Sequence, residues 1–213
     1  MSHIDFNLGV WYPEGGINRV VQSLVTLAES YGTHIAYNSP VERIEVVGGH
    51  ARGVVVNGML VEADIIISNA DYHHTETRLL EEKYQTYKES YWQKRTIAPS
   101  AFILCLGYDR KIKGLEHHSL FFDHDWMKHF DTIFENPGWP ERPSYYVSCA
   151  SKTDPTIMPP GGEALFVLVP VAAGLKDSDD LRARYAEKII NHLGDLLGED
   201  LRNPVVQKII SHR

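Results

Sequence analysis

The sequence predicts a mixed α/β (α+β) fold with a partly antiparallel sheet. Two stretches repeat apolar residues every three or four positions, which is typical of amphipathic helices. Three short apolar segments follow one another across Gly-Gly and Asn-Gly turns, and such turns join antiparallel neighbours. One further segment is apolar without interruption, a pattern typical of a strand covered on both faces. Helices mixed with strands of both kinds favour a layered α/β architecture.

The size and composition of the chain restrict the classes of protein to which it can belong. Its 213 residues suit one large domain or two intertwined ones, and its 43% hydrophobic and 23% charged residues are typical of a globular chain. The formal net charge of −7 argues against nucleic acid as a partner, because phosphate backbones are bound by clustered cations. It does not exclude a membrane surface, since one apolar face can act locally.

The first third of the chain predicts one helix and five strands. Between Ile17 and Tyr31 apolar residues recur at helical spacing, and Gly32 ends the pattern. Turn-forming Gly, Pro, Asn and Asp residues separate the expected strands. These strands are Thr33–Tyr37, Val41–Val47, Ala51–Val56, Met59–Glu62 and the doubly covered Ile65–Ser68.

The remainder predicts two helices and four strands. One helix begins at Asp71, which can cap it, and continues to about Lys94. The second covers Ser178–Leu197, with Ser178 as the N-cap and two aspartates in the first turn. The residues expected on its inward side are Leu181, Tyr185, Ile189, Leu193 and Leu196. The four strands between the helices are Ser100–Tyr108, Ser119–Phe122, Ser144–Cys149 and Ala164–Val171.

The two cysteines and the apolar runs indicate whether disulfides, a transmembrane helix or a signal peptide are expected. Cys105 and Cys149 lie in apolar, strand-like surroundings, so both are expected to be reduced core thiols. No run reaches the roughly 18 apolar residues that a spanning helix requires, so no transmembrane helix is expected. Met1–Asp5 lacks a basic head followed by an apolar run, and no signal peptide is expected.

The segment Ser68–Asp71 is the first candidate for a ligand site. It follows the doubly covered strand, and ligands of open α/β sheets bind outside the carboxyl ends of the strands. The alternative is a plain connection from strand to helix in which Asp71 serves only as the N-cap. The pattern alone leaves both interpretations open.

Eleven histidines raise the question of a metal site. Adjacent histidines point apart on a strand and about 100° apart on a helix. The histidines that are close in sequence lack the spacing that places two ligands on one helical face. We therefore expect no metal site. The sets considered are His73-His74, His117-His118, and Asp123-His124-Asp125 with His129.

Motifs for two other kinds of chemistry are missing from the chain. No Gly-x-Ser-x-Gly turn or Cys/His signature supports acyl transfer. The paired glycines stand outside any Gly-x-Gly-x-x-Gly or Gly-Lys-Ser/Thr motif, so phosphate binding is unsupported. If the protein binds a dinucleotide, the pyrophosphate loop is not expected in this chain.

Aromatic residues are concentrated near one short helical pattern. Within Asp125–Phe134, the side chains of Trp126, Phe130 and Phe134 can share one helical side. Such a stripe can pack into the core. It can also line an apolar tunnel or dip into a membrane, and the sequence leaves these alternatives open.

Four sequence blocks are informative as a set. They are Gly9–Gly16, Asn38–Ile44, Ala63–Asp71 and Thr153–Val171. Taken together, they resemble the bacterial and archaeal phytoene desaturases, which belong to the FAD-dependent amine-oxidase-like superfamily. The Thr153–Val171 block resembles carotenoid desaturases specifically, whereas others are shared more widely across the superfamily. The resemblance runs in the same order along almost the whole chain.

The resemblance implies a fold and a cofactor. The fold is an FAD/NAD(P)-binding type with a substrate-domain sheet, in which 1–96 belong to the FAD-binding domain, 97–175 to the substrate sheet, and 176–213 to a C-terminal helix and the start of a C-terminal part. Val41 matches a residue that meets the adenine edge through its backbone, and Asn69, Ala70 and Asp71 match a strand end near FAD. No catalytic residue is assigned. Asp123, His124 and Asp125 are candidates by residue type only.

The same resemblance implies an activity and a location. An FAD-dependent enzyme of this kind takes a hydride from an allylic carbon of a C40 or C30 isoprenoid polyene such as phytoene, while the protein supplies orientation and a dry apolar tunnel. The substrate dissolves in the membrane, so we expect a cytoplasmic protein that is peripheral on the inner face of the membrane. The oligomeric state stays open.

The chain departs from the family by what it lacks. Family members are longer and carry glycine-rich segments at the pyrophosphate and beside the flavin ring, so this chain resembles an internal fragment, expected to be inactive alone. Related carotene isomerases, carotenoid oxidases and retinol saturase-like flavoenzymes are alternatives within the family. From another class, a non-catalytic isoprenoid-binding module is the alternative.

Overall fold

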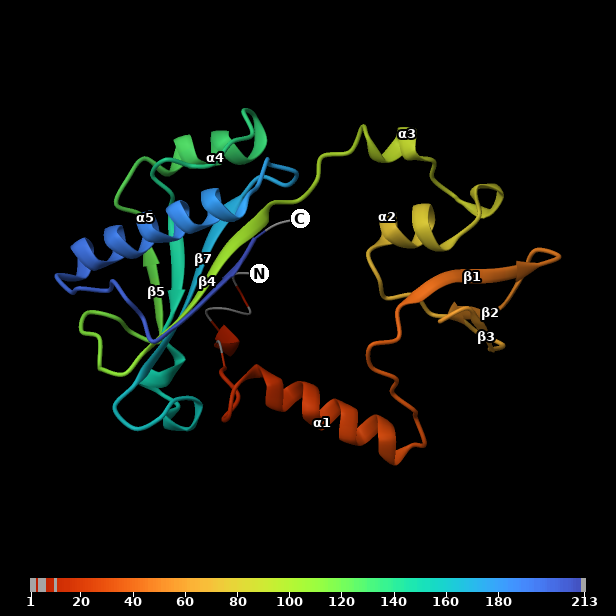
Figure 1. Ribbon diagram of the computed structural model, residues 1–213, viewed down its shortest axis with the longest axis horizontal. Helices are drawn as coiled ribbons and strands as arrows, with labels where there is room; N and C mark the ends of the chain where they lie inside the picture. Colours follow the sequence, from red (N-terminus) through yellow and green to blue (C-terminus); the bar gives the residue numbers. More distant parts are fainter. Residues whose placement is uncertain (1–2, 4–6, 10, 212–213) are drawn as a thin grey trace. The chain divides into compact units, whose positions relative to one another are not determined.

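The computed structural model describes residue 3, residues 7–9 and residues 11–211 (Figure 1). Val10 of the Gly9–Gly16 block and most of Met1–Asp5, where no signal peptide is expected, lie outside the described residues. The chain divides into two compact units, one formed by residues 1–27 with 97–213 and the other by residues 28–96. The functional division at 96 and 175 stays a prediction.

The first long element is helix α1 (Ile17–Ser30), which confirms the predicted amphipathic pattern. None of its residues is buried. Val20, Val21 and Leu24 are each about half exposed, so the described residues leave the apolar stripe largely uncovered. The spacing of apolar residues thus predicts the helix correctly but does not report what covers it.

The unit 28–96 contains a three-stranded antiparallel sheet in the order β1-β2-β3. Asn57 and Gly58 both have positive φ, as expected of a tight hairpin turn between β2 and β3. Val55 of the middle strand is buried. These strands confirm three predictions from the sequence. Their bounds are Val41–Val47 for β1, His50–Val56 for β2 and Met59–Glu62 for β3.

Two predicted strands of this unit are wrong. Thr33–Tyr37 forms no strand, and the chain turns at Asn38, whose φ is +53°. Ile65–Ser68 is not a doubly covered strand, because Ile65 and Ile67 are 80% and 87% exposed. A strand needs neighbours for its backbone hydrogen bonds, and the described residues provide none for this segment.

The single helix predicted from Asp71 to Lys94 is also wrong, because the segment forms four short pieces. A long-range polar contact accounts for the break. The buried carboxylate of Glu76 accepts hydrogen bonds from the backbone N–H groups of Thr86 at 2.7 Å and Tyr87 at 3.0 Å. These bonds fold the chain back. The pieces are α2 (Tyr72–His74), the π-helical η2 (Thr75–Leu79), the 3₁₀ turn η3 (Glu82–Tyr84) and α3 (Glu89–Trp92).

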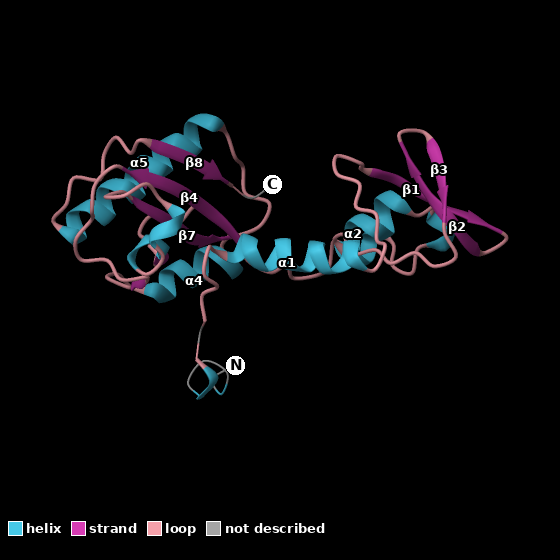
Figure 2. Ribbon diagram, turned by 90° about the horizontal axis from the view of Figure 1, so that it is seen from below, coloured by secondary structure: helices cyan, strands magenta, loops and turns pink. Residues whose placement is uncertain are grey.

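The other unit is built on a five-stranded antiparallel sheet in the order β5-β6-β7-β4-β8. Figure 2 shows β8, β4 and β7 side by side. Four strands match the prediction closely, whereas β8 was not predicted. The bounds are Ser100–Tyr108 for β4, His118–Phe121 for β5, Tyr145–Ser148 for β6, Glu163–Val171 for β7 and Val206–Ile210 for β8.

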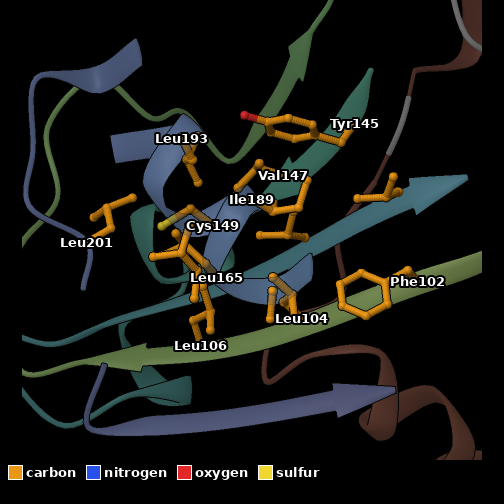
Figure 3. Packing of buried hydrophobic residues seen from close by; sticks show 14 of the residues in the cluster. Phe102, Leu104, Leu106, Tyr145, Val147, Cys149, Leu165, Ile189, Leu193 and Leu201 are labelled. Carbon is orange, nitrogen blue, oxygen red and sulfur yellow. The ribbon is translucent and has the colours of Figure 1, made fainter. Parts of the chain in front are cut away.

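One face of this sheet carries the core. Phe102 and Leu104 of β4 pair in register with Val169 and Val167 of β7, and all four side chains are fully buried. Helix α5 (Asp179–Leu197) lies across this face (Figure 1). Figure 3 shows the strand side chains meeting those of α5. Labelled there are Phe102, Leu104, Leu106, Tyr145, Val147, Cys149, Leu165, Ile189, Leu193 and Leu201.

Helix α5 confirms its prediction, including the N-cap, since the Ser178 hydroxyl accepts a hydrogen bond from the backbone N–H of Leu181. Leu196 was expected to face inward but is 43% exposed. Cys105 and Cys149 are free thiols. Cys149 is buried in the core as predicted, whereas Cys105 was also expected there but is only partly buried. Two 3₁₀ turns, η4 (Ala150–Lys152) and η5 (Pro155–Ile157), precede β7.

In β6 and β7, the side chains that alternate with the core residues point to the opposite face of the sheet. Helix α4 (Trp126–Phe134) packs against this face. The carboxylate of Asp125 caps α4 by accepting a hydrogen bond from the N–H of Met127. Among the described residues, no helix is both long and apolar enough to cross a bilayer. The mixed α/β class is confirmed, with antiparallel strands in both sheets.

Candidate functional site

Val41 is the first residue of β1, which is an edge strand of its sheet. An edge strand leaves one row of backbone N–H and C=O groups without partners in the sheet. Val41 is 37% exposed. Its backbone is therefore placed where a ligand can reach it, as the expected contact with an adenine requires.

Asn69, Ala70 and Asp71 lie in an exposed connection that leads into α2. The carboxylate of Asp71 accepts a hydrogen bond from the N–H of His74 at 3.0 Å. This bond caps α2, which was the alternative interpretation of Asp71. The hydroxyls of Ser68 and Thr75 are 2.8 Å apart and hold the connection against the start of η2.

These four residues belong to the unit 28–96, and each lies at its surface. Among the described residues, no hydrogen bond joins Val41 to the segment 69–71. The cavity described in this unit, of about 570 Å³, is lined instead by polar side chains such as His73, Arg78 and Glu89. The cofactor-binding assignment of Val41, Asn69, Ala70 and Asp71 stays a prediction.

A strongly apolar cavity of about 390 Å³ lies in the other unit, between α4 and strands β5, β6 and β7. The predicted stripe of Trp126, Phe130 and Phe134 forms one wall. Successive rings of this stripe lie 5.5 and 5.9 Å apart. The three side chains are 49%, 51% and 44% exposed, so the stripe is not core packing. Leu168 and Pro170 of β7 form the opposite wall.

His129 holds α4 in place beside this cavity. Its Nε2 lies 2.7 Å from the carbonyl oxygen of Pro170, and its Nδ1 accepts a hydrogen bond from the N–H of Ser144 at 3.0 Å. Since one nitrogen accepts and the other donates, the imidazole is neutral with its proton on Nε2. Burial lowers the pKa of His129, although the bond to Pro170 raises it. His129 is therefore a neutral structural residue.

The catalytic candidates chosen by residue type lie between β5 and α4. Asp125 is the N-cap of α4. Asp123 and His124 interact directly, with Oδ2 and Nε2 3.0 Å apart. Nε2 of His192, from α5, lies 2.9 Å from the same carboxylate oxygen.

Sequence reasoning missed His192 and Tyr145 as members of this cluster. The hydroxyl of Tyr145 lies 2.9 Å from Nδ1 of His192. Burial, and to a smaller extent the charge of Asp123, raise the pKa of this phenol. His192 follows Asp123 by about seventy residues, and no local spacing could have joined them.

The family comparison covers nearly the whole chain. The model of the flavin-containing amine oxidoreductase family matches residues 2–211. Among curated proteins, a carotenoid 3,4-desaturase of Haloarcula japonica is 43% identical over 97% of this chain and 42% of its own length. A zeta-carotene-forming phytoene desaturase of Myxococcus xanthus is 39% identical over 82% of this chain and 34% of its own length.

The chain thus spans less than half the length of these curated relatives. Among solved structures, an oxidoreductase from Methanosarcina mazei matches with a TM-score of 0.59 and 21% identity, over 93% of this chain and 43% of that one. This likeness supports the fold. The family match confirms the resemblance to carotenoid desaturases and the expected cofactor, FAD. The chain belongs to the flavin-containing amine oxidoreductase family.

Proposed function

We propose that the protein uses FAD to desaturate a C40 or C30 isoprenoid polyene such as phytoene. The observation that carries this proposal is the apolar cavity beneath α4, in a chain whose curated relatives are desaturases of carotenoids and their precursors. A polyene has no polar group to bind, so it is held by an apolar wall of matching shape.

The cavity suits such a substrate in chemistry and in size. Its lining contains no charged side chain, and the polar atoms of His129 are occupied by Ser144 and Pro170. A volume of about 390 Å³ is that of a site for a small ligand, so the cavity would hold one section of a long polyene. The remainder of the polyene would lie along the exposed rings of Trp126 and Phe130.

The surface of the unit 28–96 fits one side of a bound flavin. The edge of β1 offers backbone groups at Val41, and the exposed segment 69–71 offers an amide side chain at Asn69. Asp71 is engaged in capping α2, so its contribution would come from its remaining carboxylate oxygen or its backbone. The exposed apolar side chains of Ile65 and Ile67 precede this segment and suit a covered position.

The chemistry that the flavin supplies is acceptance of a hydride from an allylic carbon, while a proton leaves the neighbouring carbon. The residues of the described cavity contribute positioning and exclusion of water. The 213 residues contain no Gly-x-Gly-x-x-Gly motif for the pyrophosphate. We therefore propose that the chain alone does not turn over the substrate.

A chimaera tests this function. The segment of the Haloarcula japonica enzyme that this chain matches is replaced by the chain, and the product is assayed with FAD and phytoene or a desaturated carotenoid in liposomes. New conjugated double bonds, seen by chromatography with visible detection, support desaturation. A chimaera that retains flavin but only isomerises, oxygenates or saturates the polyene would contradict the proposal in favour of a related flavoenzyme.

The chain itself is assayed in parallel. Retention of the yellow flavin after desalting would show that the segments around Val41 and Asn69 suffice to hold FAD. Any desaturated product from the chain alone would overturn the proposal that it is inactive. Co-purified isoprenoid, combined with a flavin-bound chimaera that fails on every substrate, would favour a non-catalytic isoprenoid-binding module.

We also propose that the protein is cytoplasmic and peripheral on the inner face of the membrane. Four residues that line the cavity beneath α4 are each about half exposed or more, namely Leu120, Phe122, Trp126 and Phe130. Met127 of α4 is exposed as well. Exposed apolar residues gathered in this way are typical of a membrane-contacting patch.

Vesicle co-sedimentation tests this location. The chain should sediment with phospholipid vesicles, and F130D should reduce the bound fraction several-fold because a charge enters the apolar patch. L196D, on the exposed side of α5, is the matched control and should leave binding unchanged. Equal binding of F130D and the unsubstituted chain would contradict the assigned face.

A further inference from the structure

The cluster of Asp123, His124 and His192 has the donor set of a metal site. Oδ2 of Asp123 lies 2.9 Å from Nε2 of His192 and 3.0 Å from Nε2 of His124. The three donor atoms all lie within 4.8 Å of one another. With bonds of about 2.0–2.2 Å, ligand atoms around a tetrahedral zinc ion stand about 3.4 Å apart. The Asp123 oxygen therefore needs to separate from each histidine nitrogen by only a few tenths of an ångström.

The ligands are fixed by two different parts of the fold. His192 projects from α5, whose neighbouring residues Ile189 and Leu193 are packed into the core. Asp123 and His124 lie in the connection from β5, which Asp125 ends by capping α4. The rings of His124 and His192 stack with their centroids 5.5 Å apart. The donors thus converge without local helical spacing.

A second residue orients His192. Tyr145 is 2% exposed, and its hydroxyl lies 2.9 Å from Nδ1, the nitrogen that faces away from Asp123. Histidines that bind metals through one nitrogen almost always have a hydrogen-bond partner on the other. The buried phenol of Tyr145 occupies the place of such a partner, and this observation is independent of the three donor atoms.

The site also has room for a further ligand. A cavity of about 550 Å³ is lined by both His124 and His192. Two carboxylates, Glu141 and Asp195, and two cations, Arg142 and Lys188, line it as well. Three protein donors with an adjacent open position are typical of zinc sites that keep a water molecule. The side chains of Asp123, His124 and His192 are each between a quarter and a third exposed, so an ion can enter.

We propose that Asp123, His124 and His192 bind one divalent transition-metal ion of the zinc class. Two imidazole nitrogens and one carboxylate oxygen suit zinc, cobalt or nickel rather than calcium or magnesium. The ion would join α5 to the connection between β5 and α4. The site lies apart in sequence from the proposed flavin contacts at Val41 and 69–71, and its test does not depend on them.

The proposal has a consequence for the proton on His192. Without an ion, both imidazoles donate from Nε2 to Asp123, and Nδ1 of His192 accepts a hydrogen bond from the hydroxyl of Tyr145. With an ion, Nε2 is a metal ligand, so the proton must lie on Nδ1 and Tyr145 becomes the acceptor. The same argument holds for His124, whose Nε2 also faces Asp123. Metal binding is therefore expected to exchange the tautomers of both His124 and His192.

The test titrates the tag-free, chelator-treated chain with Zn²⁺ by calorimetry, and with Co²⁺ for the visible spectrum of a low-coordinate site. One equivalent should bind. H192A and H124A should each lose at least tenfold in metal affinity. Y145F, which keeps the aromatic ring and removes only the hydroxyl, should lose about 10–100-fold. H118A is the matched control, since His118 forms an adjacent histidine pair in the same unit.

Two further measurements distinguish a specific site from surface binding. Zn²⁺ at one hundred times its Kd should lower the equilibrium constant for unfolding about 100-fold, in the unsubstituted chain and H118A only. Nitrogen-15 NMR should show the protons of two histidines, His124 and His192, moving from Nε2 to Nδ1. No saturable binding, binding that H192A and H124A retain, or binding that H118A abolishes would each overturn the proposal.

Discussion

His129 offers the most direct test of how α4 is held above the apolar cavity. H129L replaces a buried ring with an apolar side chain of comparable size, and it removes the bonds to Pro170 and Ser144. Each bond contributes about 1 kcal/mol net, and a buried partner left without a bond costs about 1–3 kcal/mol. We therefore expect a loss of about 2–4 kcal/mol at pH 7.5.

The pH dependence has a defined sign. The pKa of His129 is lowered in the folded chain, mainly by burial, so the unfolded chain binds a proton first as the pH falls. Stability from the neutral imidazole is complete above the usual pKa of 6.5 and decreases as the pH falls below it. The difference between the unsubstituted chain and H129L should therefore shrink between pH 7.5 and pH 5.

The assay is urea unfolding at both pH values, combined with hydrogen exchange of the peptide that contains Ser144. The Ser144 amide should lose protection in H129L, whereas peptides of the unit 28–96 should exchange unchanged. H129Q is the control, because its amide can donate to Pro170 and accept from Ser144 without titrating. A stability change below about 0.5 kcal/mol in H129L, or unchanged protection at Ser144, would refute the reasoning.

Three further substitutions test other parts of the fold. E163Q should cost about 2–3 kcal/mol at pH 7, because Lys152, 3.0 Å away, loses its buried counter-charge. Burial would raise the pKa of Glu163, but hydrogen bonds, first that from Lys152, hold this pKa below its usual value of 4.5. The stability that the ionised carboxylate contributes is therefore lost as the pH falls below 4.5. Urea unfolding at several pH values measures both the cost of E163Q and its pH dependence. G53A would place a Cβ 2.2 Å from the carbonyl oxygen of Val61 and should expose β2 and β3 to hydrogen exchange. S178A should cost about 1 kcal/mol in thermal unfolding, since α5 loses its N-cap.

Each of these substitutions has a control. E187Q, on the exposed side of α5, should leave the free energy of unfolding unchanged at every pH. If E187Q lowered stability as much as E163Q does, the buried pair of Glu163 and Lys152 would not be the cause of the loss. In G138A the Cβ would lie 3.7 Å from the carbonyl oxygen of Asn136, an ordinary van der Waals contact, so hydrogen exchange should be unchanged. S178D retains a capping oxygen and should match the unsubstituted chain, so equal losses in S178A and S178D would contradict the capping argument.

The sequence predicts those elements whose stabilising contacts are periodic. Helix α5 and strands β4 and β7 agree with their patterns because one face of each is buried in the same core. The segment Ile65–Ser68 is equally apolar but forms no strand. An apolar pattern indicates that side chains tend to be buried, and it does not show whether a partner strand is present. The helix expected after Asp71 fails because the buried carboxylate of Glu76 binds the chain ten residues later.

The candidate sites show the same limit. The stripe of Trp126, Phe130 and Phe134 is a local pattern, and the structure places it on one wall of a cavity, which was one of the alternatives that the sequence left open. Asp123 and His124 could be chosen only by residue type. Their partner His192 is brought to them by the packing of α5, a tertiary contact that leaves no trace in local spacing.

The position of β4 between β7 and β8 has a consequence for the order of folding. Ile103 pairs with Ile210, a separation of roughly one hundred residues, and Phe102 pairs with Val169. Contacts this distant in sequence slow folding, because a long loop must close before they form. During synthesis, the apolar edge of β4 stays unpaired on one side until β8 has left the ribosome. During this interval the unpaired edge of β4 is exposed to aggregation and to binding by chaperones.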